Sequence, residues 1–140
     1  MKPVVAAILH RQGLVLLARR APGEKHAGAW EFPGGKVESG ESPDAALRRE
    51  IREELALEIN GEIREILRQP LPEFGIELIF LVAECPEGEP RLSVHDRCDW
   101  LPLDQLERPG LLPGDLPAAV FLSLNPTALG QIEAKKNRRP

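Results

Sequence analysis

Continuous apolar runs near the start of the chain predict a pair of buried strands. Residues 3–10 are rich in Val, Ala and Ile, residues 14–17 are again apolar, and a three-residue break ending in Gly13 separates them. Runs of this kind are typical of strands buried on both faces, and a short break containing glycine favours a hairpin. The run at residues 75–82 is the strongest strand in the pattern, and we expect it inside the sheet.

A helical pattern replaces the strand pattern after Ser42. Ser42 is a good N-cap, Pro43 suits the first helical position, and no helix breaker follows until well past Leu57. Apolar residues then recur at four-residue spacing, which places them in one ridge along the helix. We expect this ridge to face the core; it consists of Leu47, Ile51 and Leu55.

The second half of the chain predicts short strands and two short helices. Residues 61–68 predict a strand that Pro70 and Pro72 interrupt. Further elements are expected as short strands at 92–94 and 99–101 around a polar loop at 95–97, a short helix at 102–106 and an amphipathic helix at 116–124. The order of strands, helix, strands and helix indicates an α+β fold or a three-layer α/β/α sandwich with a mixed sheet.

Three acids share one face of the first predicted helix. Glu50, Glu53 and Glu54 stand at i, i+3 and i+4, so their carboxylates crowd together and repel one another. Clustered carboxylate oxygens are the ligands that a hard cation such as Mg²⁺ takes. Arginines share this helix, however, and a helix laced with Glu and Arg is often only a solvated face with weak ion pairs.

Length, charge and cysteine content narrow the class of protein. At 140 residues the chain is long enough for one compact domain, expected at residues 1–132, with a basic tail at 133–140. A net charge of −4 argues against a general binder of nucleic acid polymers or membranes. Cys85 and Cys98 form no disulfide framework, and the start of the chain has no signal-peptide pattern, so we expect a cytoplasmic protein.

At the acidic helix the chain resembles the Nudix hydrolase family. The family box is a glycine, five residues, a glutamate, seven residues, and then R-E-U-x-E-E-x-G-U, where U is aliphatic. The only departure is Ala56, which stands where the family has glycine and puts the local turn in doubt. The matching positions are Gly35, Glu41, Arg49, Glu50, Ile51, Glu53, Glu54 and Leu57.

The resemblance implies metal-dependent hydrolysis of a phosphoanhydride. It implies Mg²⁺, with Mn²⁺ as a substitute, and Arg49 as the residue that orients one of the carboxylates. The family takes its general base either from the box or from a later loop, where Asp96 and Asp99 are candidates that would otherwise serve solubility. By resemblance the metal residues are Gly34, Glu50, Glu53 and Glu54, and the catalytic residues are Glu50, Glu53 and Arg49.

A second resemblance, around LARRAPG and WEFPGGKVESGES, points to the MutT-like and CTP-pyrophosphohydrolase-like branch. It implies that Arg20 lies near the substrate phosphates and that Glu31 and Phe32 lie by the nucleoside. It also implies that Asp115 reads the base edge, whereas the residue pattern by itself favours Asp115 as a cap of the helix that follows it. An ionised aspartate accepts a hydrogen bond from an amino group, such as that of cytosine or guanine.

The expected function is hydrolysis of (d)NTPs, oxidised ones such as 8-oxo-dGTP first, to monophosphate and pyrophosphate. Three alternatives remain open: hydrolysis of CTP or modified dCTP, hydrolysis of another nucleoside diphosphate-X compound, and a Nudix module that only binds nucleotide. The expected partner is the nucleoside triphosphate itself, without nucleic acid polymer or membrane, and the expected state is a monomer or weak dimer.

Overall fold

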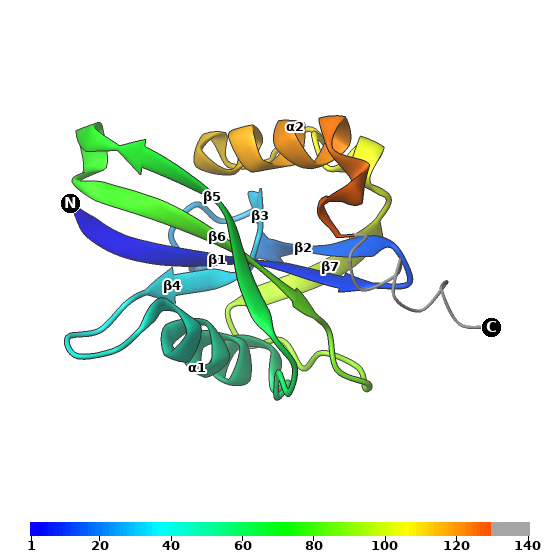
Figure 1. Ribbon diagram of the computed structural model, residues 1–140, viewed down its shortest axis with the longest axis horizontal. Coiled ribbons are helices and arrows are strands. Elements are labelled where there is room, and N and C mark those ends of the chain that lie inside the picture. Colours follow the sequence, from blue (N-terminus) through cyan, green and yellow to red (C-terminus); the bar gives the residue numbers. More distant parts are fainter. Residues whose placement is uncertain (130–140) are drawn as a thin grey trace.

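A mixed β-sheet lies between two α-helices, which gives the chain three layers (Figure 1). The computed structural model describes residues 1–129, so the expected domain end at 132 and the basic tail at 133–140 lie outside it. In the view of Figure 1, α1 (Pro43–Leu55) lies below the sheet and α2 (Leu116–Leu124) lies above it. The strands are β1 (Lys2–Arg11), β2 (Leu14–Arg20), β3 (Trp30–Glu31), β4 (Gly34–Lys36), β5 (Ile63–Leu71), β6 (Ile76–Glu84) and β7 (His95–Leu101). The predicted α/β/α sandwich is confirmed.

The sheet is assembled around β1. On one side β1 pairs in parallel with β6, from Lys2 opposite Ile76 to His10 opposite Glu84. On its other side it pairs antiparallel with β4 near its start and with β2 near its end. β5 pairs antiparallel with β6 at one edge, and β3 and β7 pair antiparallel with β2. The predicted hairpin of β1 and β2 and the internal position of β6 are therefore confirmed.

Each face of the sheet carries its own hydrophobic core. Alternate residues of a strand point to opposite faces, so an apolar run supplies side chains to both layers. On β1, Val5, Ala7 and Leu9 pack towards α1, whereas Ala6 and Ile8 pack towards α2. The predicted helix ridge is confirmed, because its three members are fully buried in the α1 core; they are Leu47, Ile51 and Leu55.

Several predicted elements of the second half differ from the structure. β5 continues through Pro70 to Leu71, because β5 is an edge strand paired only with β6, and an edge position tolerates a residue without an N–H. The expected strand at 92–94 is absent, and the expected loop at 95–97 is the first half of β7. The predicted short helix near 102–106 is a single 3₁₀ turn, Leu103–Gln105.

Helix α1 begins where the sequence predicts and ends earlier. The Ser42 hydroxyl accepts a 3.1 Å hydrogen bond from the Ala45 N–H, and Pro43 is the first helical residue. The helix stops at Leu55 because Ala56 adopts a left-handed conformation (φ 57°, ψ 37°), in which its N–H still reaches the Arg52 carbonyl at 3.0 Å. Ala56 therefore makes the turn that the family's glycine would make, with the strain of a Cβ in that region.

Replacing Ala56 with glycine is expected to stabilise the protein by about 1 kcal/mol, because glycine adopts this conformation without steric cost. The matched control is Ala45→Gly in the exposed first turn of the same helix, which should destabilise the protein by about 1 kcal/mol. Urea unfolding of the two variants measures both changes. Equal destabilisation by both substitutions would show that Ala56 is unstrained.

Among residues 1–129, no helix combines the length and the apolar character that crossing a membrane requires. Cys85 is buried and Cys98 is half-buried, and both are free thiols.

Candidate active site

Arg49 on α1 binds two glutamates of the box at once. Its guanidinium donates to both oxygens of Glu41, at 2.8 and 3.0 Å, and to Oε1 of Glu50 at 2.8 Å. It also donates to the Lys36 carbonyl at 2.9 Å, which ties α1 to β4. The hydrogen bonds from Arg49 lower the pKa of Glu41 to about 2. Arg49 thus fixes Glu50 relative to the loop before the helix, while Oε2 of Glu50 takes no part in this contact.

The glycine pair at the start of β4 makes room for neighbouring groups of the protein itself. A Cβ on Gly34 would lie 2.0 Å from the Val5 carbonyl oxygen, so only glycine allows β4 to pair with β1 there. A Cβ on Gly35 would lie 2.4 to 2.6 Å from the carboxylate atoms of Glu50. The glycine pair therefore admits β1 and the Glu50 side chain.

Glu54 is a half-buried residue, and one of its carboxylate oxygens, Oε1, is buried without a partner. No group within residues 1–129 hydrogen-bonds its Oε1, which is shielded from solvent. Burial raises the pKa of Glu54 to about 8, and the charges of Glu50 and Glu31 add to this effect. The backbone near Glu54 is held firmly, because the Ser93 hydroxyl donates to the carbonyls of Glu53 and Glu54 at 3.2 and 3.5 Å.

The acidic face fits a divalent cation in its chemistry but is not gathered into a coordination sphere. Within the described chain no three Asp, Glu, His or Cys side chains are grouped as metal ligands. Glu53 has a side chain 60% exposed, and it lies 3.6 Å from Arg49. Burial raises the pKa of Glu50 although Arg49 acts against it. The unpartnered Oε1 of Glu54 and this acid-rich surrounding supply the hard oxygen donors that Mg²⁺ prefers, so the residues fit the ion.

Arg20, Glu31 and His95 form a second charged cluster on the α1 face of the sheet. The sequence predicts the first two as site residues but not His95. Glu31 on β3 receives two hydrogen bonds on Oε2, one from Arg20 at 2.9 Å and one involving Nε2 of His95 at 2.8 Å. The His95 side chain is completely buried. Arg20 also donates to the Lys25 carbonyl and lies 3.7 Å from Glu24. Sequence reasoning missed His95 because it assigned residues 95–97 to a solvent-exposed loop.

An irregularity in the sheet brings these three side chains together. Arg19 pairs with Arg97, but Arg20 pairs with His95, so Asp96 is an extra residue that forms a β-bulge. Cross-strand partners point to the same face, and His95 therefore joins Arg20 on the α1 face while Arg97 joins Arg19 on the other. Without the bulge, His95 and Arg97 would share a face.

The loop acids Asp96 and Asp99 lie in a different cluster. The Arg19 guanidinium holds Asp96 at 2.8 and 3.2 Å and keeps its pKa low. Burial acts to raise the pKa of Asp99, but its hydrogen bonds with Arg108 (2.7 Å) and Arg97 (3.2 Å) keep it below its usual value. The three arginines surround the Trp30 ring on the α2 face, with Arg108 3.8 Å from its centroid. The structure does not bring these acids to the α1 carboxylates.

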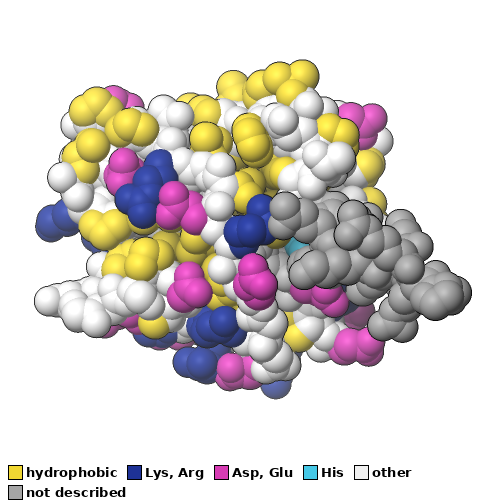
Figure 2. Space-filling view, viewed as in Figure 1, with side chains coloured by type: hydrophobic (Ala, Val, Ile, Leu, Met, Phe, Trp, Pro, Cys, Tyr) yellow, Lys and Arg dark blue, Asp and Glu magenta, His cyan; other side chains and the backbone are white. Residues whose placement is uncertain are grey.

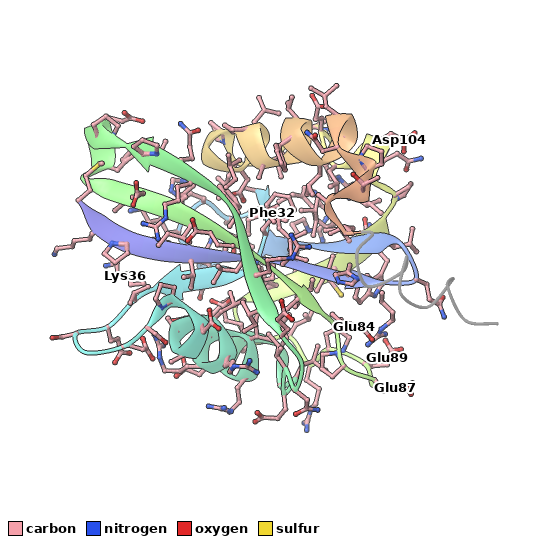
Figure 3. The ribbon with its side chains drawn as sticks, in the orientation of Figure 1. Phe32, Lys36, Glu84, Glu87, Glu89 and Asp104 are labelled. Atoms are coloured by element: carbon pink, nitrogen blue, oxygen red, sulfur yellow. The ribbon has the colours of Figure 1, made fainter. Side chains whose placement is uncertain are left out.

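Asp115 does not cap helix α2. No side-chain capping bond forms, and its Oδ2 instead accepts a 3.0 Å hydrogen bond from the Phe32 N–H. Phe32 itself lies between the sheet and α2, in edge contact with Phe80 (Figure 3). Burial raises the pKa of Asp115 to about 7, with a smaller contribution from the charge of Glu31. The structure thus joins Phe32 and Asp115, two residues that the family resemblance assigns to the nucleoside.

The outer surface is mixed in charge. On the face drawn in Figure 2, basic and acidic side chains interleave, in keeping with the ion pairs of Arg68 with Glu65 and Glu77. Hydrophobic side chains gather along the top of that view, over α2, where Leu124 is 75% exposed. Glu84 lies at the end of β6, and Glu87 and Glu89 lie in the connection that follows it (Figure 3).

Comparison with known proteins identifies the family of this chain. The NUDIX domain model matches residues 1–121. The CTP pyrophosphohydrolase of Escherichia coli (strain K12) is 40% identical over 121 residues, which span 84% of this chain and 87% of that protein. The 8-oxo-dGTP diphosphatase of the same organism is 32% identical over 119 residues, spanning 84% and 92%. The solution structure of the E. coli ORF135 protein superposes with a TM-score of 0.72 at 34% identity, covering 91% of this chain and 92% of that one. The chain therefore belongs to the Nudix family and is a Nudix pyrophosphohydrolase.

Proposed function

We propose that this chain hydrolyses a nucleoside triphosphate to a nucleoside monophosphate and pyrophosphate with the help of Mg²⁺. Oε1 of Glu54 is the observation that carries this proposal, because a buried carboxylate oxygen without a partner costs free energy that a bound cation recovers. Glu50 and Glu53 lie on the same helix, and the Gly34 carbonyl group belongs to the adjoining strand. These four residues are the proposed cation ligands.

In the proposed reaction the cation would supply charge neutralisation, and the residues of the chain would orient the reacting groups. When bound, a divalent cation neutralises the polyphosphate and lowers the pKa of a bound water. Arg49 holds Glu50 by one oxygen and so orients the other towards the reaction centre. We assign the general base to a box glutamate, either Glu50 or the exposed Glu53, because Asp96 and Asp99 are bound by arginines on the other side of the sheet.

Mg²⁺ dependence is expected to be complete. Turnover should fall to background in excess EDTA, return on addition of Mg²⁺, and return in part with Mn²⁺, because all three cation ligands from the helix are carboxylates. Initial rates at a fixed triphosphate concentration measure this. Undiminished hydrolysis in EDTA would overturn the proposed role of the acidic face.

The substrate end of the site is proposed to lie at Arg20, Glu31, Phe32 and Asp115. Arg20 carries a positive charge for the phosphates, and Phe32 and Asp115 are joined by a hydrogen bond beside the α2 core. An ionised Asp115 accepts from the amino group of cytosine or the 2-amino group of guanine, and a protonated one also donates to a carbonyl. This favours 8-oxo-dGTP, the first candidate, and CTP or modified dCTP, the second.

A panel of substrates separates these candidates. Each common and oxidised (d)NTP is assayed with Mg²⁺, alongside ADP-ribose, a nucleotide sugar and a dinucleoside polyphosphate. A kcat/KM for 8-oxo-dGTP far above that for dGTP supports the oxidised purine, and preference for CTP or a modified dCTP supports the pyrimidine. Cleavage of only the other compounds would overturn the triphosphate proposal, and no turnover would leave a binding module.

Asp115→Asn is expected to change the discrimination between the two preferred bases by about tenfold or more, because an amide offers a fixed donor and acceptor in place of a titrating group. The control is Asp104→Asn, on the 3₁₀ turn Leu103–Gln105 and exposed. Ratios of kcat/KM on paired substrates measure the effect. An unchanged ratio in Asp115→Asn would remove Asp115 from base recognition.

A further inference from the structure

We propose that His95 is a positioning residue of this active site, which holds Glu31 so that one carboxylate oxygen faces the substrate. The inference rests on the proposed triphosphate hydrolysis and adds a residue that the family box does not contain. Three features carry it: the complete burial of His95, its 2.8 Å contact with Glu31, and the β-bulge that turns it to the α1 face.

The hydrogen bonds around Glu31 indicate which atom donates in the contact between Nε2 of His95 and Oε2 of Glu31. Arg20 already donates to Oε2 of Glu31, so this oxygen acts as a carboxylate acceptor, and the proton between Glu31 and His95 belongs to Nε2 of His95. Nδ1 of His95 is buried and has no hydrogen-bond partner within residues 1–129. A proton on Nδ1 would therefore be an unpaired buried donor, which is costly. Nε2 of His95 is accordingly the donor to Glu31.

Two donors on Oε2 leave Oε1 of Glu31 as the oxygen available to another group. No hydrogen bond within the described chain reaches Oε1, and the Glu31 side chain keeps 12% of its surface exposed. Glu31 is also close enough to Glu54 and to Asp115 to act on both carboxyls electrostatically. It therefore stands between the acidic helix and the proposed base end of the site, at Asp115.

Arg20 and His95 both bind Oε2 of Glu31, but they constrain its carboxylate to different degrees. Arg20 donates a charged hydrogen bond to Glu31, but its long side chain also contacts Lys25 and Glu24 in the exposed loop after β2. His95 has a short, fully buried ring on a strand, and a ring held in this way has few alternative positions. His95 therefore sets the direction of the Glu31 carboxylate, as a neighbour that orients a functional group usually does.

Two substitutions at His95 separate positioning from packing. His95→Leu fills the buried space without a donor, whereas His95→Gln keeps an N–H close to the position of Nε2. We expect kcat/KM to fall by about 10- to 100-fold in His95→Leu and to stay within about threefold of wild type in His95→Gln. The control is His10→Leu on β1, which removes another buried histidine at the end of the sheet away from Glu31. It should alter stability but leave kcat/KM unchanged.

A double-mutant cycle gives the second readout. If His95 acts through Glu31, then adding His95→Leu to Glu31→Gln should lower kcat/KM by less than about threefold further. Affinity for an α,β-methylene triphosphate, measured by calorimetry, should show the same pattern without turnover. Full additivity, equal loss in His95→Leu and His95→Gln, or wild-type activity in His95→Leu would each overturn the inference. An inactive wild-type chain that fails to bind the analogue would instead overturn the proposed function.

Discussion

Replacing Glu54 with glutamine is expected to reduce Mg²⁺-dependent hydrolysis by about a thousandfold, because it removes a proposed cation ligand and with it several kcal/mol of transition-state stabilisation. Initial rates with each preferred triphosphate measure this loss. The matched control is Glu58→Gln, since Glu58 lies just beyond the same helix and makes only a surface pair with Arg52. Glu58→Gln should keep wild-type activity.

The same substitution is expected to stabilise the metal-free protein at alkaline pH. Burial raises the pKa of Glu54 from 4.5 to about 8 in the folded protein, so the folded state binds this proton more tightly than the unfolded state. The stability that protonation gives is complete below pH 4.5 and is lost as pH rises towards 8, by up to about 1.4 kcal/mol per pH unit. Because glutamine does not ionise, the Glu54→Gln variant should not lose this part of its folding stability as pH rises.

Thermal unfolding in EDTA at pH 5.5 and pH 8.5 measures the effect. We expect Glu54→Gln to exceed wild type at pH 8.5 and to match it more closely at pH 5.5. A variant that is both inactive and more stable would be the signature of a carboxylate kept for function at a cost in stability. A Glu54→Gln variant with wild-type turnover would contradict the assignment of the site.

Replacing Arg49 with methionine is expected to lower kcat/KM by about 10- to 100-fold and to lower the unfolding temperature. Arg49 is the hydrogen-bond donor to both Glu41 and Glu50, so its loss leaves like charges facing one another on the acidic face. Arg49→Lys should recover only part of the activity, because an ammonium cannot form the paired contact with Glu41 and reach Glu50 as well.

The control for Arg49 lies one turn along the helix. Arg52→Met removes an arginine whose pair with Glu58 is more than half exposed on both sides, and surface pairs of this kind contribute little. It should change neither activity nor unfolding temperature appreciably. Equal effects of the two substitutions, measured by steady-state kinetics and thermal unfolding, would show that Arg49 is an ordinary surface arginine.

The sequence predicts best what local physical chemistry decides. Ser42, Pro43 and the spacing of Leu47, Ile51 and Leu55 determine the start and the buried face of α1, and the structure has both. The end of α1 is less predictable, because alanine rarely adopts a left-handed conformation. Ala56 does so here, and the Leu55 carbonyl at the helix end instead accepts a 2.8 Å hydrogen bond from the Arg91 N–H, which comes from the distant connection between β6 and β7.

Long-range pairing accounts for the parts of the site that the sequence leaves open. The bulge at Asp96 depends on how β7 pairs with β2, and no local signal marks it. That bulge decides which acids and bases meet: His95 reaches Glu31, whereas Asp96 reaches Arg19. The motif residues of α1 are found from their spacing, but the residues that orient their neighbours are found only after the strands are paired.

The most direct measurement of the central claim is the identity of the phosphorus-containing products formed by the wild-type chain with Mg²⁺. A preferred triphosphate is incubated with the purified protein and followed by ³¹P NMR, with Glu54→Gln as the parallel sample. We expect nucleoside monophosphate and pyrophosphate in equal amounts from the wild type and almost none from the variant. Release of orthophosphate with nucleoside diphosphate, or equal product in both samples, would contradict the account.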